Sequence, residues 1–265
     1  MRKIGLEELR RIQLEILEDV HLFCRQNGIR YSLCGGTMLG AVRHQGYIPW
    51  DDDIDLMMPR PDYERFAATY KSSRNRLIDL RNHPACVELC LKVERNNTML
   101  KDLALGRTLW GINIDIFPVD GAPERAVEHC MQILSLRRRI ARICPFYKVV
   151  ESRKAVWFLK YLVKRILFPY PVSFLSLKRG VDRKAAACRM EESALSGVIL
   201  GSYAEKELVP TAVFESFFPT LFEGNEYMAI EGYDTYLSAI YGNYMELPPE
   251  EKRVTHHLYD AFIDD

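Results

Sequence analysis

The chain places four aspartates shortly after a pair of glycines, and this spacing is its most informative chemical feature. The residues concerned are Gly35, Gly36, Asp51, Asp52, Asp53 and Asp55. Carboxylates this close repel one another and raise one another's pKa unless a cation lies among them. Glycines at a turn let a phosphate come close to the backbone. The combination predicts chemistry on a phosphate with a divalent metal ion.

Alternation of polar and apolar residues selects three carboxylates for this site. A strand over residues 53–57 would turn Asp53 and Asp55 to the same face, because side chains alternate along a strand. Residues 111–118 alternate in the same way and carry Asp115. We therefore expect Asp53, Asp55 and Asp115 to be both the metal ligands and the catalytic residues.

Three carboxylates beside a phosphate suit two-metal phosphoryl transfer. Mg²⁺ prefers carboxylate, phosphate and water oxygens, and two ions would offset charge on the attacking and leaving oxygens. We expect two Mg²⁺ ions, with Mn²⁺ as the alternative, bridged by Asp53 and Asp55. Asp115 would hold the ion that activates the acceptor hydroxyl or would take its proton. Singly, each aspartate would more often be structural, and we assign Asp51 to a cap or turn and Asp52 to an outer hydrogen-bond partner.

The elements that must position these residues alternate between helix and strand. We expect helices over residues 6–26, 37–42, 61–70 and 233–241, strands over 29–33, 76–80 and 87–93, mostly helix over 124–192, and short strands with turns over 198–230. Gly35 and Gly36 then fall at a strand-to-helix turn with Thr37 as the helix cap. Free backbone N–H groups at such a helix start can hold a phosphate.

The overall charge is balanced, but its distribution is not. Lys plus Arg and Asp plus Glu both number 36, which gives no indication of a nucleic-acid partner. Residues 137–189 nevertheless hold fifteen basic and two acidic side chains. Such a block is either a solvated helical face or a surface for an anionic membrane. Its apolar stretch, 155–168, is interrupted by lysines and is too short to span a bilayer, although a helix lying in the membrane plane stays open.

Cysteine usage and the N-terminus point to the cytoplasm. The seven cysteines are an odd, scattered set, which favours reduced thiols over a disulfide framework. Residues 1–6 lead directly into the first predicted helix and lack the apolar core of a signal peptide. His83, Cys86 and Cys90 have no matching second ligand pair, so a zinc site is the weaker interpretation.

Three motifs carry a resemblance to a known family. Residues 35–55 resemble the signature of the LicD family, and Asn113 to Pro118 with Asp120 match a second motif. A third match runs from Tyr241 to Met245, with Leu247 to Pro249 and Arg253. The chain departs from the family where Glu231-Gly232-Tyr233 replaces the usual proline, which affects a loop and no carboxylate.

The resemblance implies an α+β fold with a nucleotidyltransferase-like core, a mixed β-sheet and helical additions. Residues 1–123 would form the catalytic core and residues 124–265 a mostly helical, basic region packed on it. The resemblance implies transfer of phosphocholine from CDP-choline to a cell-surface glycan or its lipid-linked precursor. The fukutin and fukutin-related ribitol-phosphate transferases are more distant relatives. Transfer of another CDP-alcohol's phosphate, nucleotidyl transfer and a non-catalytic binding role remain the alternatives.

The resemblance also suggests donor-binding residues. Gly35, Gly36 and Thr37 would hold the donor phosphate. The side chains expected to approach the diphosphate are Arg43, His44 and Arg253. An aromatic cage for a quaternary ammonium group is expected from the aromatic residues that flank the carboxylates, namely Tyr47, Trp50, Trp110 and Phe117. We expect a cytoplasmic protein with peripheral contact to the inner membrane through residues 137–189.

Overall fold

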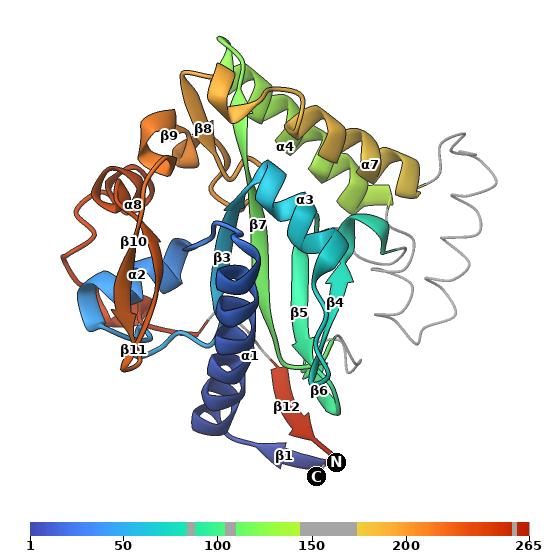
Figure 1. Cartoon of the computed structure of the whole chain (residues 1–265), viewed down its shortest axis with the longest axis vertical. Coiled ribbons are helices and arrows are strands. Elements are labelled where there is room, and N and C mark those ends of the chain that lie inside the picture. The colour runs from blue at the N-terminus through green and yellow to red at the C-terminus, as the bar shows by residue number, and fades with distance from the viewer. Residues whose placement is uncertain (84–87, 104–109, 144–173, 256–258, 265) are drawn as a thin grey trace.

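The computed structural model describes residues 1–83, 88–103, 110–143, 174–255 and 259–264 (Figure 1). Its centre is a β-sheet in which β3 and β7 are parallel and their other neighbours antiparallel. The strand order is β2 (Ser32–Leu33), β3 (Asp55–Pro59), β7 (Asn113–Ala122), β5 (Leu91–Arg95) and β4 (Asn75–Asp79). The predicted α+β class with a mixed sheet is confirmed.

Two predicted helices cover one face of this sheet (Figure 1). The first, α1 (Leu6–Asn27), ends at Gly28, whose φ of 59° is the left-handed conformation that glycine adopts easily. The second, α3 (Arg60–Thr69), follows β3 directly. Ile114 of β7 belongs to the same hydrophobic core as the buried face of α1. Because strand side chains alternate, Asp115 faces the opposite side of the sheet.

The remaining elements surround this layer. At the β2 end lie α2 (Gly35–His44), α8 (Tyr233–Tyr241) and the hairpin of β10 (Phe217–Phe222) and β11 (Asn225–Ile230) (Figure 1). Two helices, α4 (Ala126–Ile143) and α7 (Phe174–Ala185), pack on each other. Further strands are β1 (Arg2–Ile4), β6 (Thr98–Asp102), β8 (Leu195–Gly197), β9 (Val209–Pro210) and β12 (Tyr259–Ile263). Single 3-10 turns are η1 (Leu80–Asn82), η2 (Met190–Glu192), η3 (Ala204–Glu207), η4 (Thr211–Phe214) and η5 (Glu250–Lys252).

The main hydrophobic core draws on both ends of the chain. It includes Ile4 near the N-terminus and Ala261 near the C-terminus, and β12 pairs with both β1 and β6. The predicted boundary between residues 123 and 124 therefore does not separate two cores, and the domain division stays a prediction. Among the described residues the free thiols are Cys24, Cys34, Cys90, Cys130 and Cys188.

The start of β3 differs from the strand expected over residues 53–57. Regular pairing begins only at Asp55. The preceding backbone is bound instead by side chains of α1: Arg10 donates to the carbonyl of Asp51, and Gln13 donates to the carbonyl of Asp52 over 2.9 Å. These helix side chains hold the aspartate-rich segment as a fixed loop. Alternation in the sequence could not reveal them, because they come from an element forty residues away.

Some basic side chains of residues 137–189 make contacts inside the protein. Lys178 of α7 is fully buried, and its ammonium donates to the carbonyls of Leu80 and His83. Arg137 of α4 donates to the carbonyl of Gly201 over 2.6 Å. These two cations therefore bind the protein itself. Residues 144–173 of this block, which include the apolar stretch 155–168, lie outside the described residues, so membrane contact through residues 137–189 stays a prediction. Within the described chain, every helix is too short or too polar to cross a bilayer.

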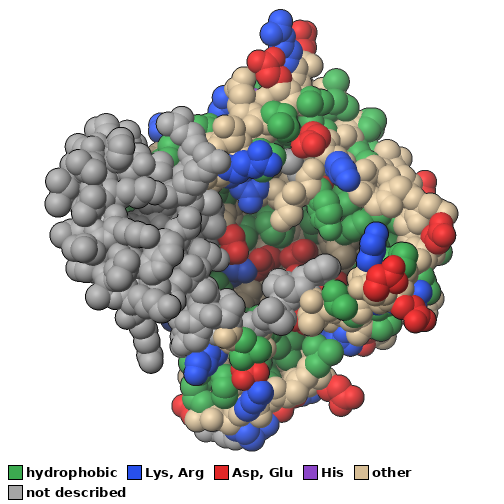
Figure 2. Space-filling view, turned by 180° about the vertical axis from the view of Figure 1, so that it is seen from behind, with side chains coloured by type: hydrophobic (Ala, Val, Ile, Leu, Met, Phe, Trp, Pro, Cys, Tyr) green, Lys and Arg blue, Asp and Glu red, His purple; other side chains and the backbone are tan. Residues whose placement is uncertain are grey.

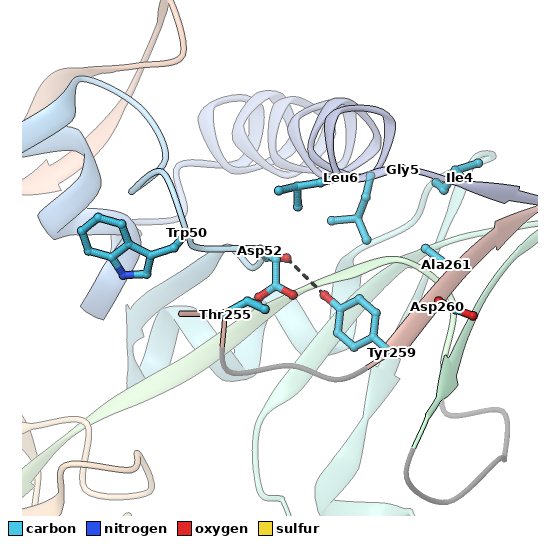
Figure 3. Close-up of a pocket in the computed structure, with 10 residues that line it drawn as sticks. Ile4, Gly5, Leu6, Trp50, Asp52, Thr255, Tyr259, Asp260 and Ala261 are labelled. Carbon is cyan, nitrogen blue, oxygen red and sulfur yellow. Dashed lines mark hydrogen bonds between the residues drawn. The ribbon is translucent and has the colours of Figure 1, made fainter. Parts of the chain in front are cut away.

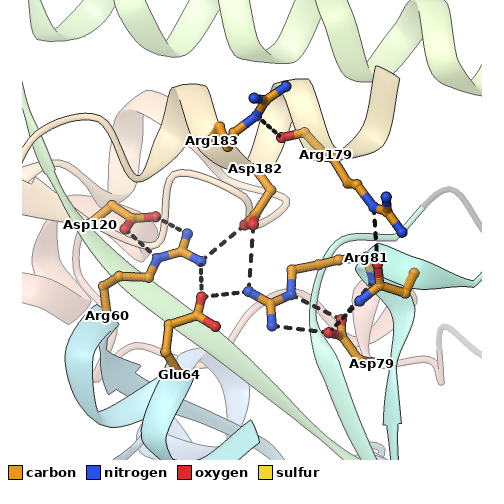
Figure 4. A network of polar contacts seen from close by, with 9 residues as sticks. Arg60, Glu64, Asp79, Arg81, Asp120, Arg179, Asp182 and Arg183 are labelled. Carbon is orange, nitrogen blue, oxygen red and sulfur yellow. Dashed lines mark hydrogen bonds and ion pairs between the residues drawn. The ribbon is translucent and has the colours of Figure 1, made fainter. Parts of the chain in front are cut away.

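An ion-pair network fastens α7 to the core (Figure 4). Arg60 of α3 binds both carboxylate oxygens of Asp120, over 2.7 and 2.6 Å, and reaches Asp182 of α7 over 3.0 Å. Arg81 contacts the same Asp182 at 3.5 Å and binds Asp79. Asp120 is 1% exposed, so its charge depends on Arg60 for compensation.

Candidate active site

The glycine turn brings a helix N-terminus against the carboxylates. Gly35 begins α2 with a φ of 49°, in the left-handed region that favours glycine. A Cβ atom at Gly35 would lie 3.7 Å from Oδ2 of Asp55, and one at Gly36 would lie only 2.9 Å from Oδ2 of Asp51. The Asp51 carboxylate therefore occupies the space beside the glycine backbone. A phosphate held there would meet its negative charge, so the arrangement requires a cation between them.

Two carboxylates face each other across β3 and β7. Asp55 and Asp115 are direct partners in the parallel register. Burial and then the charges of Asp53 and Asp115 raise the pKa of Asp55 well above its usual range. Figure 2 shows acidic side chains in a hollow on the side of the molecule opposite α1 and α3. The structure therefore brings Asp55 and Asp115 together, with Asp53 close enough to influence both.

The loop before β3 adds a second set of carboxylates. One carboxylate oxygen each from Asp51, Asp52 and Asp53 lies within 4.8 Å of the others. Burial and the charge of Asp53 raise the pKa of Asp51 to about 8. These three carboxylates could therefore hold an ion together, and the assignment of Asp51 to a cap or turn and of Asp52 to an outer hydrogen-bond partner stays a prediction.

Lys92 is a functional candidate that the sequence interpretation missed. Its ammonium contacts both carboxylate oxygens of Asp115, over 2.5 and 2.6 Å, from the neighbouring position on β5. Burial disfavours the ammonium, but the charges of Asp115 and Glu88 hold the pKa of Lys92 well above its usual range. The alternation of residues 91–95 could have indicated a lysine on the polar face of the sheet.

Cys90 with Glu88 and Asp115 forms another group of potential ligand atoms, while Cys86 lies outside the described residues.

Thr37 contributes from inside α2. The helix begins two residues earlier, so Thr37 is not its cap, and its Oγ1 accepts the backbone N–H of Asp55 over 2.9 Å. This bond fixes the start of β3 relative to the glycine turn. Whether Thr37 also touches a donor phosphate stays a prediction.

Arg43 and His44 lie in the last turn of α2. At a rise of about 1.5 Å per residue, they are about 12 Å along the helix from Gly35. The Arg43 guanidinium donates to the carbonyl of Tyr244 over 2.7 Å and to that of Glu246 over 3.3 Å. The structure thus assigns Arg43 a contact with the C-terminal motif, and contact with the diphosphate stays a prediction.

The four aromatic residues proposed as a cage occupy different surroundings. Tyr47 is buried, and its hydroxyl donates to Oε1 of Gln13 over 3.0 Å. Trp110 stacks edge-to-face on His83, and Phe117 packs beside the same small cluster. The structure does not gather the four around one point.

Trp50 and Arg253 lie together at another edge of the molecule. The Arg253 guanidinium is 5.8 Å from the centre of the Trp50 ring and donates to the carbonyl of Pro248. Trp50 also lines a cavity of about 220 Å³ in which the Tyr259 hydroxyl donates to the carbonyl of Asp52 (Figure 3). A closing movement of Arg253 over a diphosphate stays a prediction.

A buried glutamate, Glu207, is connected to the glycine turn through the hydroxyl of Tyr236. The Tyr236 hydroxyl accepts the N–H of Gly35 over 3.4 Å and donates to Oε2 of Glu207 over 3.1 Å. Burial raises the pKa of Glu207 to about 8, because hydrogen bonds offset only part of the desolvation. The sequence interpretation missed this pair, which joins η3 and α8 to the start of α2.

Replacing this glutamate tests its protonation. A carboxyl whose pKa rises from 4.5 to about 8 on folding destabilises the native state progressively as the pH increases between those values. We expect the Glu207→Gln variant to lose less stability than the wild type between about pH 5 and about pH 8.5. Urea unfolding at several pH values measures the difference. Parallel stability curves for the two proteins would contradict the raised pKa.

The donor set fits a hard divalent cation. Asp51, Asp52, Asp53 and Asp55 offer oxygen atoms only, which is the preference of Mg²⁺ and Mn²⁺. Lys92 binds one carboxylate of the site, that of Asp115. Oxygen ligands and an adjacent helix N-terminus together suit a metal-bound phosphate.

Known proteins are similar to this chain in the site region, and one of them is similar over nearly its whole length. Residues 28–125 match the family described as LicD/FKTN/FKRP, nucleotidyltransferase domain. The lipopolysaccharide cholinephosphotransferase LicD of Haemophilus influenzae is 29% identical over 270 aligned positions, covering 99% of this chain and 100% of that protein. The ribitol 5-phosphate transferase FKRP of Mus musculus is 62% identical over 29 residues, which are 11% of this chain and 6% of that protein. An uncharacterised protein of Rickettsia typhi is 31% identical over 97 residues, 35% of this chain and 31% of its own.

Proposed function

Because the chain belongs to the LicD family of phosphotransferases, we propose that it transfers phosphocholine from CDP-choline to a saccharide hydroxyl. The acceptor would be a cell-surface glycan, such as lipopolysaccharide, or its lipid-linked precursor, and CMP would be released. The observation that carries this proposal is the carboxylate cluster against the glycine turn, in a chain that aligns over its whole length with a cholinephosphotransferase.

The proposed reaction exchanges one phosphorus–oxygen bond for another. The acceptor hydroxyl oxygen forms a bond to the phosphorus that bears choline, and the bond from that phosphorus to the bridging oxygen breaks. CMP keeps the bridging oxygen, and a carboxylate of the cluster takes the hydroxyl proton. The Gly36 backbone N–H would orient the diphosphate. Lys92 holds both oxygens of Asp115, so it would fix that carboxylate in place.

The proposed cofactor is Mg²⁺, as two ions, with Mn²⁺ as the alternative. Asp53, Asp55 and Asp115 would hold it, and Asp51 and Asp52 are close enough to Asp53 to join them. When bound, the metal would offset the charge of the diphosphate and of the leaving CMP. We also propose that the protein acts in the cytoplasm, at the inner membrane surface.

Product analysis tests the proposed function. CDP-choline labelled in choline, CDP-choline labelled in cytidine, and Mg²⁺ would be incubated with a lipopolysaccharide that lacks phosphocholine. We expect the choline label on the glycan and an equal amount of free CMP. Cytidine label on the glycan would overturn the proposal in favour of nucleotidyl transfer.

A second candidate function is the same phosphotransfer reaction with ribitol or glycerol in place of choline. The short, highly similar segment shared with the ribitol 5-phosphate transferase favours it, since a related site there serves another phospho-alcohol. CDP-ribitol and CDP-glycerol would be compared with CDP-choline in the same assay. If kcat/KM for CDP-ribitol or CDP-glycerol exceeds that for CDP-choline, the transferred group is ribitol phosphate or glycerol phosphate and not phosphocholine.

A further inference from the structure

Two tyrosines that no sequence motif assigned to the donor lie beside the glycine turn. Tyr203 precedes η3, and Tyr241 is the last residue of α8. Their rings meet edge-to-face with centres 5.5 Å apart, and the Tyr203 hydroxyl donates to the Tyr241 hydroxyl over 3.3 Å. These contacts hold the two rings as one aromatic unit.

The aromatic unit lies close to the carboxylates. A Cβ atom at Gly35 would lie 3.8 Å from the Tyr241 hydroxyl and 3.7 Å from Oδ2 of Asp55. The negative charge of Asp55 is among the causes that raise the pKa of both phenols. Tyr203 is 41% exposed, so the residue is not enclosed by the core.

An aromatic unit of this kind favours a cationic ligand. The faces of aromatic rings attract cations. The Arg43 guanidinium, which interacts with Tyr241, is bound to the carbonyls of Tyr244 and Glu246. A quaternary ammonium group suits these surroundings because it makes no hydrogen bonds and gains from contact with an aromatic ring.

Resting on the proposed function, we propose that Tyr203 and Tyr241 form the wall that recognises the quaternary ammonium end of the donor. They take the place of the cage expected from Tyr47, Trp50, Trp110 and Phe117, which the structure disperses. The pair would select a cationic alcohol over a neutral one and would leave the nucleotide end of the donor unaffected.

Replacing the exposed ring tests this assignment. For the Tyr203→Leu variant we expect kcat/KM for CDP-choline to fall about tenfold, the size of a desolvated cation–π contact. The inhibition constant of CDP-glycerol, measured against CDP-choline, should stay within about twofold, because a neutral alcohol gains nothing from the ring. The Tyr203→Phe variant keeps the ring and should restore the preference. Tyr233→Leu, at the other end of α8 and packed on Phe218, is the matched control and should change neither constant.

The outcomes separate this proposal from the proposed function. Equal losses for CDP-choline and CDP-glycerol would assign the ring to the shared nucleotide and overturn the proposal. An unchanged kcat/KM for CDP-choline in Tyr203→Leu would overturn it as well. If the wild type moves no choline from CDP-choline, the proposed function itself fails, whatever the variants do.

Discussion

The Asp55→Asn variant should lose about a thousandfold in transfer rate and yet unfold at a higher temperature than the wild type. The loss corresponds to ~4 kcal/mol of transition-state stabilisation, the several kcal/mol expected when a metal ligand is removed. The gain arises because Asp55 is a half-buried carboxyl that is partly desolvated and crowded by Asp53 and Asp115, and a neutral amide relieves both penalties. Initial rates with CDP-choline and thermal unfolding in EDTA measure the two effects.

Asp115 provides the contrast, because it has a buried cationic partner. The Asp115→Asn variant should also lose transfer, but its stability should fall by about 3 kcal/mol, since Lys92 would keep a buried charge without its carboxylate. A stability change of the same sign in the two variants would contradict this account of the cluster. Full transfer by either variant would contradict the proposed site.

The Asp120→Ala variant should lower the free energy of unfolding by about 3–5 kcal/mol, because it leaves the Arg60 charge partly buried without its bidentate partner. Urea unfolding measures this loss. The matched control is Glu128→Ala, which breaks an exposed pair with Arg125 and should change stability by less than about 1 kcal/mol. Equal effects of the two substitutions would show that the network is no stronger than a surface ion pair.

Local patterns in the sequence predicted most of the elements. The helix over residues 233–241 is observed with those bounds, the helix over 6–26 ends one residue later in α1, and the helix over 61–70 begins and ends one residue earlier in α3. Strands were less well defined: the strand expected over 87–93 is observed as Leu91–Arg95. A strand's limits depend on its neighbour, and alternation within a single segment does not contain that information.

The sequence indicated candidate residues where a local pattern carries them and missed those that only the fold brings to the same region. Gly35 and Asp55 were identified from one short segment, and Asp115 from its own strand. Lys92, Tyr203 and Glu207 reach the same region through the sheet register and through the packing of η3 and α8. No local pattern marks Tyr203 or Glu207, so only the fold joins these two residues to the site.

Arg10 and Gln13 bind the backbone of residues 51 and 52, and this affects which segment of the chain can fold by itself. The segment that matches the family model begins at residue 28, after α1 has ended. Yet two side chains of α1 hold the backbone of its aspartate loop. The segment that matches the family model is therefore smaller than the unit that must fold. A fragment of residues 28–125 would keep every aspartate of the candidate site but would lose Arg10 and Gln13, the two side chains that hold the aspartate loop.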